Sequence, residues 1–261
     1  MFRFYKYQGA GNDFILIDGM QMHPQFSKDE ISNLCSRHYG IGADGLIILT
    51  PCNQADFEML YYNADGGLGS MCGNGGRCAV AFAQQIRLVK NTCTFKAYDG
   101  MHHAFVLETN LKESTVKLQM ADVDLIMHTA LGYVLNTGSP HVVVFVADVA
   151  DVDVVKQGAA LRYNDAFLPG GTNVNFVSVH DDVLHVRTYE RGVENETQSC
   201  GTGVTACALA YAFKTNTNIQ NVRLKTPGGL LEVNFKLDAT HASQIYLTGL
   251  ATQVFSGEIV L

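Results

Sequence analysis

Two short stretches of the sequence place a cysteine directly before a Gly-x-Gly turn. The first, GSMCGNGGRCAVAFAQQ, covers residues 69–85 and contains Cys72; the second, QSCGTGVTACALAYAF, covers residues 198–213 and contains Cys200. Each turn opens into a small, apolar run, which predicts a helix that is buried on every side. Because the first turn of a helix leaves backbone N–H groups unpaired and carries positive potential, a thiolate there is stabilised. Each stretch therefore predicts a reactive sulfur beside an anion-binding turn.

Two such loops on opposite sides of a substrate would suit a reaction that inverts a carbon centre. A thiolate removes a proton from one face of the carbon, and a thiol returns a proton to the other face. The helix amides also stabilise the negative charge that a carboxylate gains when the neighbouring α-proton leaves. This chemistry predicts a small amino-acid substrate and requires neither a metal nor an organic cofactor.

The composition is that of a soluble globular protein without cross-links. The chain has 261 residues, of which 47% are hydrophobic and 16% charged, and a formal net charge of −7, which argues against a nucleic-acid partner or an acidic membrane surface. No apolar run approaches the roughly 20 residues of a membrane span, and the N-terminus lacks the apolar core of a signal peptide. We therefore expect a cytoplasmic protein with seven free thiols. Five of them are expected to be packed and inert: Cys35, Cys52, Cys78, Cys93 and Cys207.

Period-two alternation dominates the chain and predicts many strands. The hairpin turns are expected at Asp99-Gly100 and Gly228-Gly229. Helices are expected from the capping box Ser27–Glu30 to about Arg37, over about 149–162, and in the two apolar runs that follow the cysteines. These elements predict an α+β fold in which two mixed, curved, barrel-like sheets each wrap around one buried helix.

The two halves of the chain resemble each other, which predicts an ancient duplication. MLYYNADG…SMCGNG (59–75) matches HVRTYERG…QSCGTG (185–203), and GNDFILI (11–17) more loosely matches NVNFVSV (173–179). The seam is expected near residues 117–123. We therefore predict two pseudo-symmetric domains with the active site at their interface.

The order and content of five separated motifs resemble the diaminopimelate epimerase family: GAGNDF (9–14), NADG with MCGNGGRC (63–78), SPH (139–141), TNVNF (172–176) and ERG…SCGTG (190–203). The resemblance implies a cofactor-independent isomerase that interconverts LL- and meso-diaminopimelate for lysine and peptidoglycan synthesis. It also implies a domain over residues 1–117, to which a C-terminal strand over 251–261 returns, and a second domain over 118–250.

The resemblance also implies roles for individual residues. Cys72 and Cys200 would be the acid–base pair, and His141 would support the cysteines electrostatically. Glu190 and Arg191 would bind the distal amino-acid group of the substrate or polarise the site. The remaining substrate-binding residues would be three asparagines and the two residues after each cysteine: Asn12, Asn63 and Asn173, Gly73 and Asn74, Gly201 and Thr202.

Two positions depart from the family pattern at places where the substrate would bind. Many members have Gly-Asn-Pro-His where this chain has Ser139 before Pro140, and some members have Gln where Gly45 follows Asp44. Both departures bear on the choice of substrate more than on the type of reaction.

Other interpretations of the same residues stay open. One is a racemase of another amino acid on the same fold, of the proline or hydroxyproline type, although such racemases usually have His where Asn74 stands. Another is a catalytically silent relative that binds amino acids, and a third is a redox role for the cysteine pair. Asn74 and Thr202 also suit turns or caps, His141 suits a structural role, and the Glu190–Arg191 pair suits an ion pair at a strand end.

Three further patterns carry little weight. Residues 201–206 fit a dinucleotide fingerprint but follow a polar run instead of a strand. The cysteine spacing does not fit a zinc module, and His102-His103 suits a solvated strand edge. The strand-rich run over 142–146 would permit a homodimer.

Overall fold

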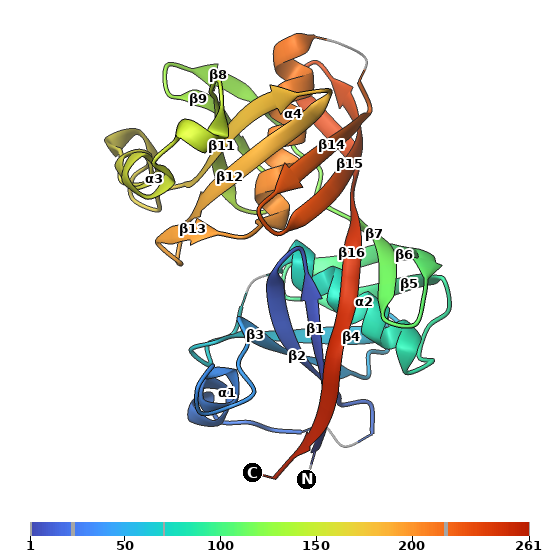
Figure 1. Ribbon diagram of the computed structural model, residues 1–261. Coiled ribbons are helices and arrows are strands. Elements are labelled where there is room, and N and C mark those ends of the chain that lie inside the picture. The colour runs from blue at the N-terminus through green and yellow to red at the C-terminus, as the bar shows by residue number, and fades with distance from the viewer. Residues whose placement is uncertain (1, 22–23, 70, 217–218, 261) are drawn as a thin grey trace. The chain divides into compact units, whose positions relative to one another are not determined.

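The computed structural model describes residues 2–21, 24–69, 71–216 and 219–260, which form two compact units (Figure 1). The first unit comprises residues up to Leu118 together with those from Gly249 on, and the second runs from Gln119 to Thr248. Each unit contains a strongly curved sheet and one central helix, as the α+β prediction required.

The sheet of the first unit curls around helix α2. Its strands follow the order β1-β2-β3-β4-β5-β6-β7-β16, and β16 also pairs antiparallel with β1, from Phe2 opposite Ile259 to Gln8 opposite Thr252. The barrel therefore closes on itself and leaves α2 inside, in contact with β1, β2, β3, β4 and β6. The elements are β1 (Phe2–Gly9), β2 (Asn12–Asp18), α1 (Lys28–Cys35), β3 (Gly45–Thr50), β4 (Phe57–Asn63), α2 (Gly73–Gln85), β5 (Thr92–Ala97), β6 (Gly100–Thr109), β7 (Glu113–Gln119) and the C-terminal part of β16 (His241–Ile259).

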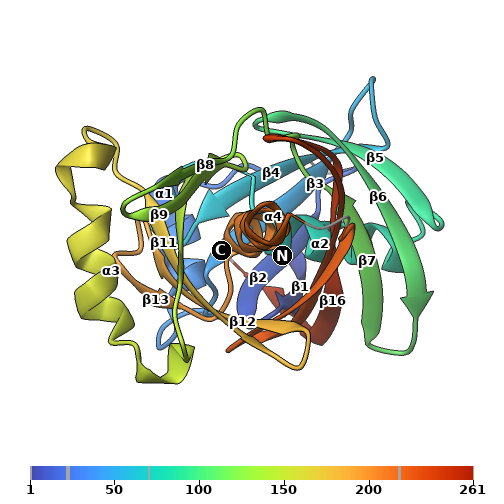
Figure 2. The same ribbon diagram turned by 90° about the horizontal axis from the view of Figure 1, so that it is seen from above.

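The second unit repeats this arrangement around helix α4, which Figure 2 shows end-on within the curve of its strands. Its strand order is β16-β15-β14-β12-β11-β10-β9-β8, with β13 beside β12. The elements are β8 (Met127–Thr129), β9 (Gly132–Asn136), β10 (Pro140–Phe145), the 3₁₀ turn η1 (Val149–Asp151), α3 (Val154–Arg162), η2 (Asp165–Phe167), β11 (Asn173–His180), β12 (Val183–Glu190), β13 (Asn195–Thr197), α4 (Gly201–Thr215), β14 (Asn221–Thr226) and β15 (Gly229–Asp238).

The connectivity of the two units is the same. In each unit an antiparallel pair leads to a parallel pair across a helix, β2 with β3 around α1 and β10 with β11 around α3. The next strand is antiparallel, and after the central helix the chain returns in a second parallel pairing, β4 with β5 and β12 with β14. The stretch 59–75 therefore does correspond to 185–203.

The weaker sequence match between the halves is wrong. Residues 11–17 fall on β2, whose counterpart is β10, whereas residues 173–179 fall on β11, whose counterpart is β3. Alternating apolar strands look alike in sequence because a period of two reports burial on one face and not topology.

Three predicted boundaries also differ from the structure. The helix expected over 149–162 is interrupted, because Asp148 caps η1 and Asp153 caps α3 separately. The two predicted hairpin turns lie one residue earlier, at Tyr98-Asp99 and Pro227-Gly228. The glycine that follows each turn opens the next strand at a positive φ of 132° or 141°, which a residue with a side chain rarely adopts.

Burial of apolar side chains holds each central helix in place. In α2 every residue from Gly73 to Ala83 is buried, and in α4 the side chains Val204 to Ala210 are buried without exception. A fully buried side chain of the size of valine or leucine contributes about 1.5–3 kcal/mol through removal of apolar surface from water. Among the described residues, no helix is long and apolar enough to cross a membrane.

Candidate active site

Cys72 is the N-cap of α2, so its sulfur lies at the positive end of a buried helix. The residue has an extended backbone (φ −114°, ψ 120°), and the Gly75 N–H donates to Sγ over 3.5 Å. The Asn12 Oδ1 atom also lies 3.5 Å from Sγ, and the Asn74 side-chain amide donates to the same oxygen over 3.5 Å. Three residues that the sequence singled out therefore lie together in the first unit.

The GAGN motif explains why Asn12 reaches this position. Ala10 and Gly11 form a two-residue hairpin turn with positive φ values of 51° and 81°, and Asn12 is the first residue of the returning strand. Its Nδ2 donates to Asp44 Oδ2 over 2.5 Å, which orients the amide with Oδ1 toward the sulfur. Sequence reasoning had given Asp44 no role; only the contact across 32 residues reveals it.

A network of charges fixes this corner of the unit. The Asp13 carboxylate pairs with Lys6 at 2.7 Å and with Arg37 at 2.8 Å, and Arg37 also pairs with Asp44 at 2.7 Å. Burial opposes ionisation of Asp13, but the hydrogen bonds and charges of Arg37 and Lys6 outweigh burial and lower the pKa of Asp13 to about 2. Lys6 is itself 6% exposed and also donates to the Gly42 carbonyl.

Arg77 lies beneath the first turn of α2 and is completely buried. Its guanidinium donates to the Gly73 carbonyl at 3.1 Å and to Asn74 Oδ1 at 2.9 Å, so it holds the two residues that follow Cys72. Burial lowers the pKa of Arg77, while the nearby sulfurs of Cys78 and Cys72 act in the opposite direction. Sequence reasoning gave Arg77 no role, although an arginine inside an apolar helix was a usable signal.

Cys200 is the N-cap of α4 and has the same backbone conformation as Cys72. Its backbone is extended in the same way (φ −117°, ψ 115°), and its sulfur lies 3.3 Å from Thr202 Oγ1. The Thr137 hydroxyl donates to the Thr202 carbonyl over 2.9 Å and so anchors the turn that follows the cysteine. Gly201 and Thr202 are the first two residues of the helix.

His141 connects to this turn from β10. Its Nε2 lies 3.0 Å from Thr202 Oγ1 and 3.1 Å from Ser139 Oγ, and its Nδ1 lies 3.0 Å from the side-chain amide of Asn175. The ring is completely buried, and burial together with the charge of Arg191 lowers the pKa of His141 to about 3. The imidazole is therefore neutral at physiological pH.

Asn173 joins two loops of the second unit. Its Nδ2 donates to Ser139 Oγ at 3.1 Å and to the Pro140 carbonyl at 3.0 Å, and its Oδ1 accepts the Arg191 N–H at 2.9 Å. Glu190, the last residue of β12, accepts the Thr197 hydroxyl at 2.8 Å. The Arg191 side chain is exposed.

The predicted residues thus gather into two clusters, one in each unit. In the first unit hydrogen bonds join Asn12 to Cys72 and Asn74, with Gly73 between the last two. Asn63 stands apart from these bonds: it ends β4 opposite Gly45, and its backbone N–H donates to Gly67. In the second unit the cluster comprises Cys200, Gly201, Thr202, His141, Asn173 and Arg191, and Glu190 precedes Arg191.

Comparison with known proteins identifies the family of this chain. A family model described as diaminopimelate epimerase matches residues 4–126 and 133–254. A diaminopimelate epimerase of Flavobacterium psychrophilum is 46% identical over 98% of this chain and 100% of its own length, and one of Aquifex aeolicus is 40% identical over 98% and 97%. The chain belongs to the diaminopimelate epimerase family. The family expected from the sequence motifs is thereby confirmed.

Solved structures similar to this member of the diaminopimelate epimerase family show the same fold at low sequence identity. A phenazine biosynthesis protein of the PhzF family from Bacillus anthracis aligns with a TM-score of 0.78 at 14% identity and covers 100% of this chain and 99% of its own. A probable proline racemase from Agrobacterium radiobacter aligns with a TM-score of 0.69 at 14% identity over 100% and 93%. At such identities the likeness establishes the two-domain, barrel-like fold alone.

The structure gives a physical reason for one departure from the pattern of the diaminopimelate epimerase family. A Cβ atom at Gly45 would lie 2.5 Å from the Tyr62 carbonyl and 2.6 Å from the Tyr61 ring, so no side chain fits there. A Cβ at Gly69 would lie 2.4 Å from the same ring. Tyr61 therefore fills the space that a side chain at position 45 would occupy. The other departure, Ser139, uses its hydroxyl within the His141 cluster.

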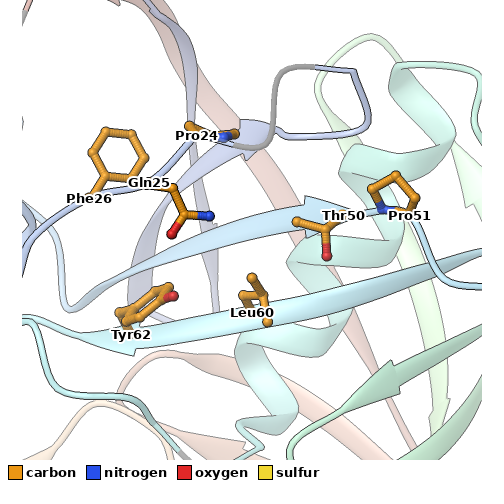
Figure 3. Close-up of a pocket in the computed structure, with 7 residues that line it drawn as sticks. All are labelled: Pro24, Gln25, Phe26, Thr50, Pro51, Leu60 and Tyr62. Carbon is orange, nitrogen blue, oxygen red and sulfur yellow. The ribbon is translucent and has the colours of Figure 1, made fainter.

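Neither of two cavities in the first unit is lined by Asn12, Cys72 or Asn74, although Met71, which precedes Cys72, lines the smaller one. One, of about 290 Å³, lies between the segment 24–26 and strands β3 and β4 (Figure 3). It is lined by Pro24, Gln25, Phe26, Thr50, Pro51, Leu60 and Tyr62, none of which belongs to the hydrogen-bonded clusters around Cys72 or Cys200. Within the described residues no cluster of three or more His, Cys, Asp or Glu side chains has the arrangement of a metal site.

Proposed function

We propose that this protein is a diaminopimelate epimerase that interconverts the LL and meso forms of diaminopimelate by inverting one α-carbon. The observation that carries the proposal is that both central helices begin at a cysteine with the same extended N-cap geometry, in a chain that belongs to the epimerase family. Membership of the family supports the substrate, and the paired cysteines support the reaction.

The proposed reaction moves one proton at each face of the carbon. The thiolate of one cysteine removes the α-proton and becomes a thiol, and the electron pair left on the carbon is delocalised into the substrate carboxylate. The other cysteine, initially a thiol, then delivers its proton to the opposite face and becomes a thiolate. The amides at the start of α2 and α4 stabilise the carboxylate charge while it is largest. After one turnover the two cysteines have exchanged protonation states.

The surrounding residues would supply orientation and selectivity. Asn12 and Asn74 would present polar atoms beside Cys72, and Thr202 would do so beside Cys200, as their hydrogen bonds to or near each sulfur suggest. Arg191, exposed at the turn that Asn173 holds, would bind the distal amino-acid group together with Glu190. Asn63 would bind a polar end of the substrate. For the reaction to occur, the two cysteines must meet at an interface between the domains, which is part of the proposal.

The other predictions from the sequence complete the proposal. The protein would act without a metal or an organic cofactor, in the cytoplasm and as a homodimer. A racemase of the proline type is the alternative, and a hydroxyproline epimerase from Agrobacterium vitis has the same fold at a TM-score of 0.70 and 13% identity. The much higher identity to proteins named diaminopimelate epimerase favours diaminopimelate.

The decisive experiment is hydrogen exchange with solvent. Purified, reduced protein is incubated in heavy water with LL-diaminopimelate and, separately, with L-proline and other L-amino acids, and both mass and chirality are read. We expect deuterium at one α-carbon of meso-diaminopimelate while the remaining LL substrate is still unlabelled at early times. Exchange in another amino acid instead would show that the protein is a racemase of that amino acid.

Single replacements of the cysteines test the acid–base pair. Cys72→Ala and Cys200→Ala should each abolish epimerisation, and Cys93→Ala, a buried cysteine on β5, provides the matched control. Serine at either reactive position should lower kcat by orders of magnitude, because an alkoxide is much harder to form than a thiolate. Full activity in the Cys200→Ala protein would overturn the two-base mechanism.

A further inference from the structure

We propose that Asn175 is a positioning residue that fixes the tautomer of His141 and thereby directs the Thr202 hydroxyl to donate to the sulfur of Cys200. The inference rests on the proposed function only in that Cys200 is taken as a reacting thiol. It assigns a role to a buried asparagine that lies within the TNVNF motif but to which the sequence analysis gave no role.

The first step is the orientation of the Asn175 amide. This side chain is completely buried on β11, and its Nδ2 lies 3.0 Å from His141 Nδ1 and 3.3 Å from the Val142 carbonyl oxygen. Its Oδ1 accepts the hydroxyl of Thr188 at 3.0 Å. A backbone carbonyl only accepts hydrogen bonds, so the NH₂ group and not the oxygen must face Val142. The amide is thus held by partners on both sides.

The second step is the tautomer of the imidazole. Because the Asn175 NH₂ group also faces His141 Nδ1, that nitrogen must accept and carries no proton. The neutral ring therefore holds its proton on Nε2, which lies 3.0 Å from Thr202 Oγ1 and 3.1 Å from Ser139 Oγ. His141 acts as a donor to the hydroxyl group and not as a base.

The third step is the direction of the hydroxyl. With its oxygen accepting from His141, Thr202 can donate its own proton to Cys200 Sγ or to Ser139 Oγ, each 3.3 Å away. Ser139 Oγ already accepts from the Asn173 amide and can donate its own proton to Thr202, which leaves the Thr202 proton for the sulfur. A hydrogen bond to a thiolate stabilises the charged form of the cysteine. The chain of donors therefore runs from Asn175 through His141 and Thr202 and ends on the sulfur.

Close packing fixes the position of Asn175 relative to helix α4. A Cβ atom at Gly203 would lie 2.5 Å from Asn175 Oδ1 and 3.4 Å from Cys200 Sγ, so the asparagine sits directly beneath the first turn of α4. Only a glycine allows this approach. Two titratable groups among the described residues act on this series of hydrogen bonds: the charge of Arg191 acts on His141, and Cys207 interacts with Cys200.

The first unit provides an internal comparison, because the equivalent positions there are apolar. In the first unit Phe14 pairs with Gly45, and Ile47 lies two residues after Gly45. In the second unit His141 pairs with Asn173, and Asn175 lies two residues after Asn173. Phe14 therefore corresponds to His141, and Ile47 corresponds to Asn175. A Cβ at Gly75 would accordingly meet Ile47 at 3.2 Å and Phe14 at 3.4 Å. Cys72 therefore does not depend on a chain of this kind and serves as a control in every sample.

The test compares wild type with Asn175→Asp and Thr202→Val. In the aspartate variant a carboxylate replaces the NH₂ group, draws the His141 proton to Nδ1 and leaves Nε2 to accept from Thr202. Iodoacetamide alkylation is measured from pH 5 to pH 10, and each modified peptide is quantified by mass spectrometry. We expect the alkylation midpoint of Cys200 to rise by about one pH unit in both variants, a tenfold loss of thiolate, while that of Cys72 moves by less than about 0.3.

A second measurement does not depend on the variants. ¹⁵N spectra of histidine-labelled protein report which ring nitrogen carries the proton, and His141→Gln serves to assign the signal. The proposal requires protonated Nε2 in the wild type and protonated Nδ1 in folded Asn175→Asp. A wild-type signal with the proton on Nδ1, or an unchanged Cys200 midpoint in folded Thr202→Val, would overturn it. Neither measurement uses a substrate, so a failure of the proposed epimerase activity would be seen separately.

Discussion

The pairing of Asp13 with Lys6 and Arg37 makes a quantitative prediction about the pH dependence of stability. The pKa of the Asp13 carboxyl falls from 3.8 to about 2 in the folded protein. At about 1.4 kcal/mol for each pKa unit, this corresponds to about 2.5 kcal/mol of folding free energy at neutral pH. Because the folded-state pKa is lowered, the contribution is complete above pH 5 and is lost as the pH falls toward 2.

Replacing Asp13 by Asn removes this titration and leaves Lys6, which is 6% exposed, without its carboxylate. We expect a loss of about 3 kcal/mol at pH 7, since removing one partner of a buried pair leaves an uncompensated charge. At pH 3, where the wild type has already lost part of the Asp13 contribution, the difference between the two proteins should shrink by about 1 kcal/mol.

The assay is urea unfolding followed by circular dichroism at pH 7 and pH 3. Arg37→Gln is the comparison variant, because it removes the Arg37 hydrogen bonds to Asp13 but leaves Lys6 paired with the carboxylate. The Arg37 side chain is 56% exposed, so its loss should cost at most about 1 kcal/mol. A difference between wild type and Asp13→Asn that is equal at the two pH values would refute the reasoning. Asp13→Asn should also lower turnover. The backbone N–H of each aspartate, Asp13 and Asp44, donates to the carboxylate of the other, and Asp44 in turn orients Asn12 beside Cys72.

Three further substitutions test how residues of the central helices hold the site. Arg77→Met should lower kcat at least tenfold with little change in melting temperature, because Gly73 and Asn74 lose their donor while the cost of burying a cation is also removed; unchanged kcat would show that the arginine only fills space. Gly203→Ala should destabilise the protein by about 1–3 kcal/mol in thermal unfolding, since its methyl group overlaps the Asn175 oxygen. Gly75→Ala, whose nearest neighbour is the end of the Ile47 side chain at 3.2 Å, should cost less, and an equal loss in both would contradict the assigned packing.

Local sequence patterns were sufficient for the features that depend on neighbouring residues. The capping box at Ser27 forms with Glu30 as expected, and both apolar runs after the cysteines are buried helices with the cysteine as N-cap. Such features depend on contacts within three or four residues and on hydrophobic periodicity, and both can be recognised from the sequence alone.

Features that depend on distant contacts came only from the tertiary structure. His141 meets Thr202 across 61 residues, and Asn175 meets His141 across 34, so neither the tautomer nor the donor chain can be read from a motif. The ion pairs around Asp13 could likewise not be predicted from the sequence, because Lys6, Arg37 and Asp44 lie in separate segments of the chain.

The sequence by itself determined the repeated helix N-caps, the buried central helices and the family. The tertiary structure decided which strands correspond between the halves and which side chains surround each sulfur. The reason is physical: local structure follows from short-range backbone hydrogen bonds and apolar periodicity, whereas the environment of a reactive group is set by strands that pair across long stretches of chain. The two cysteines therefore look alike in sequence, while the strand side chains beneath the first turn of each helix differ: apolar Phe14 and Ile47 lie next to Gly75, and polar Asn175 lies next to Gly203 and is bonded to His141.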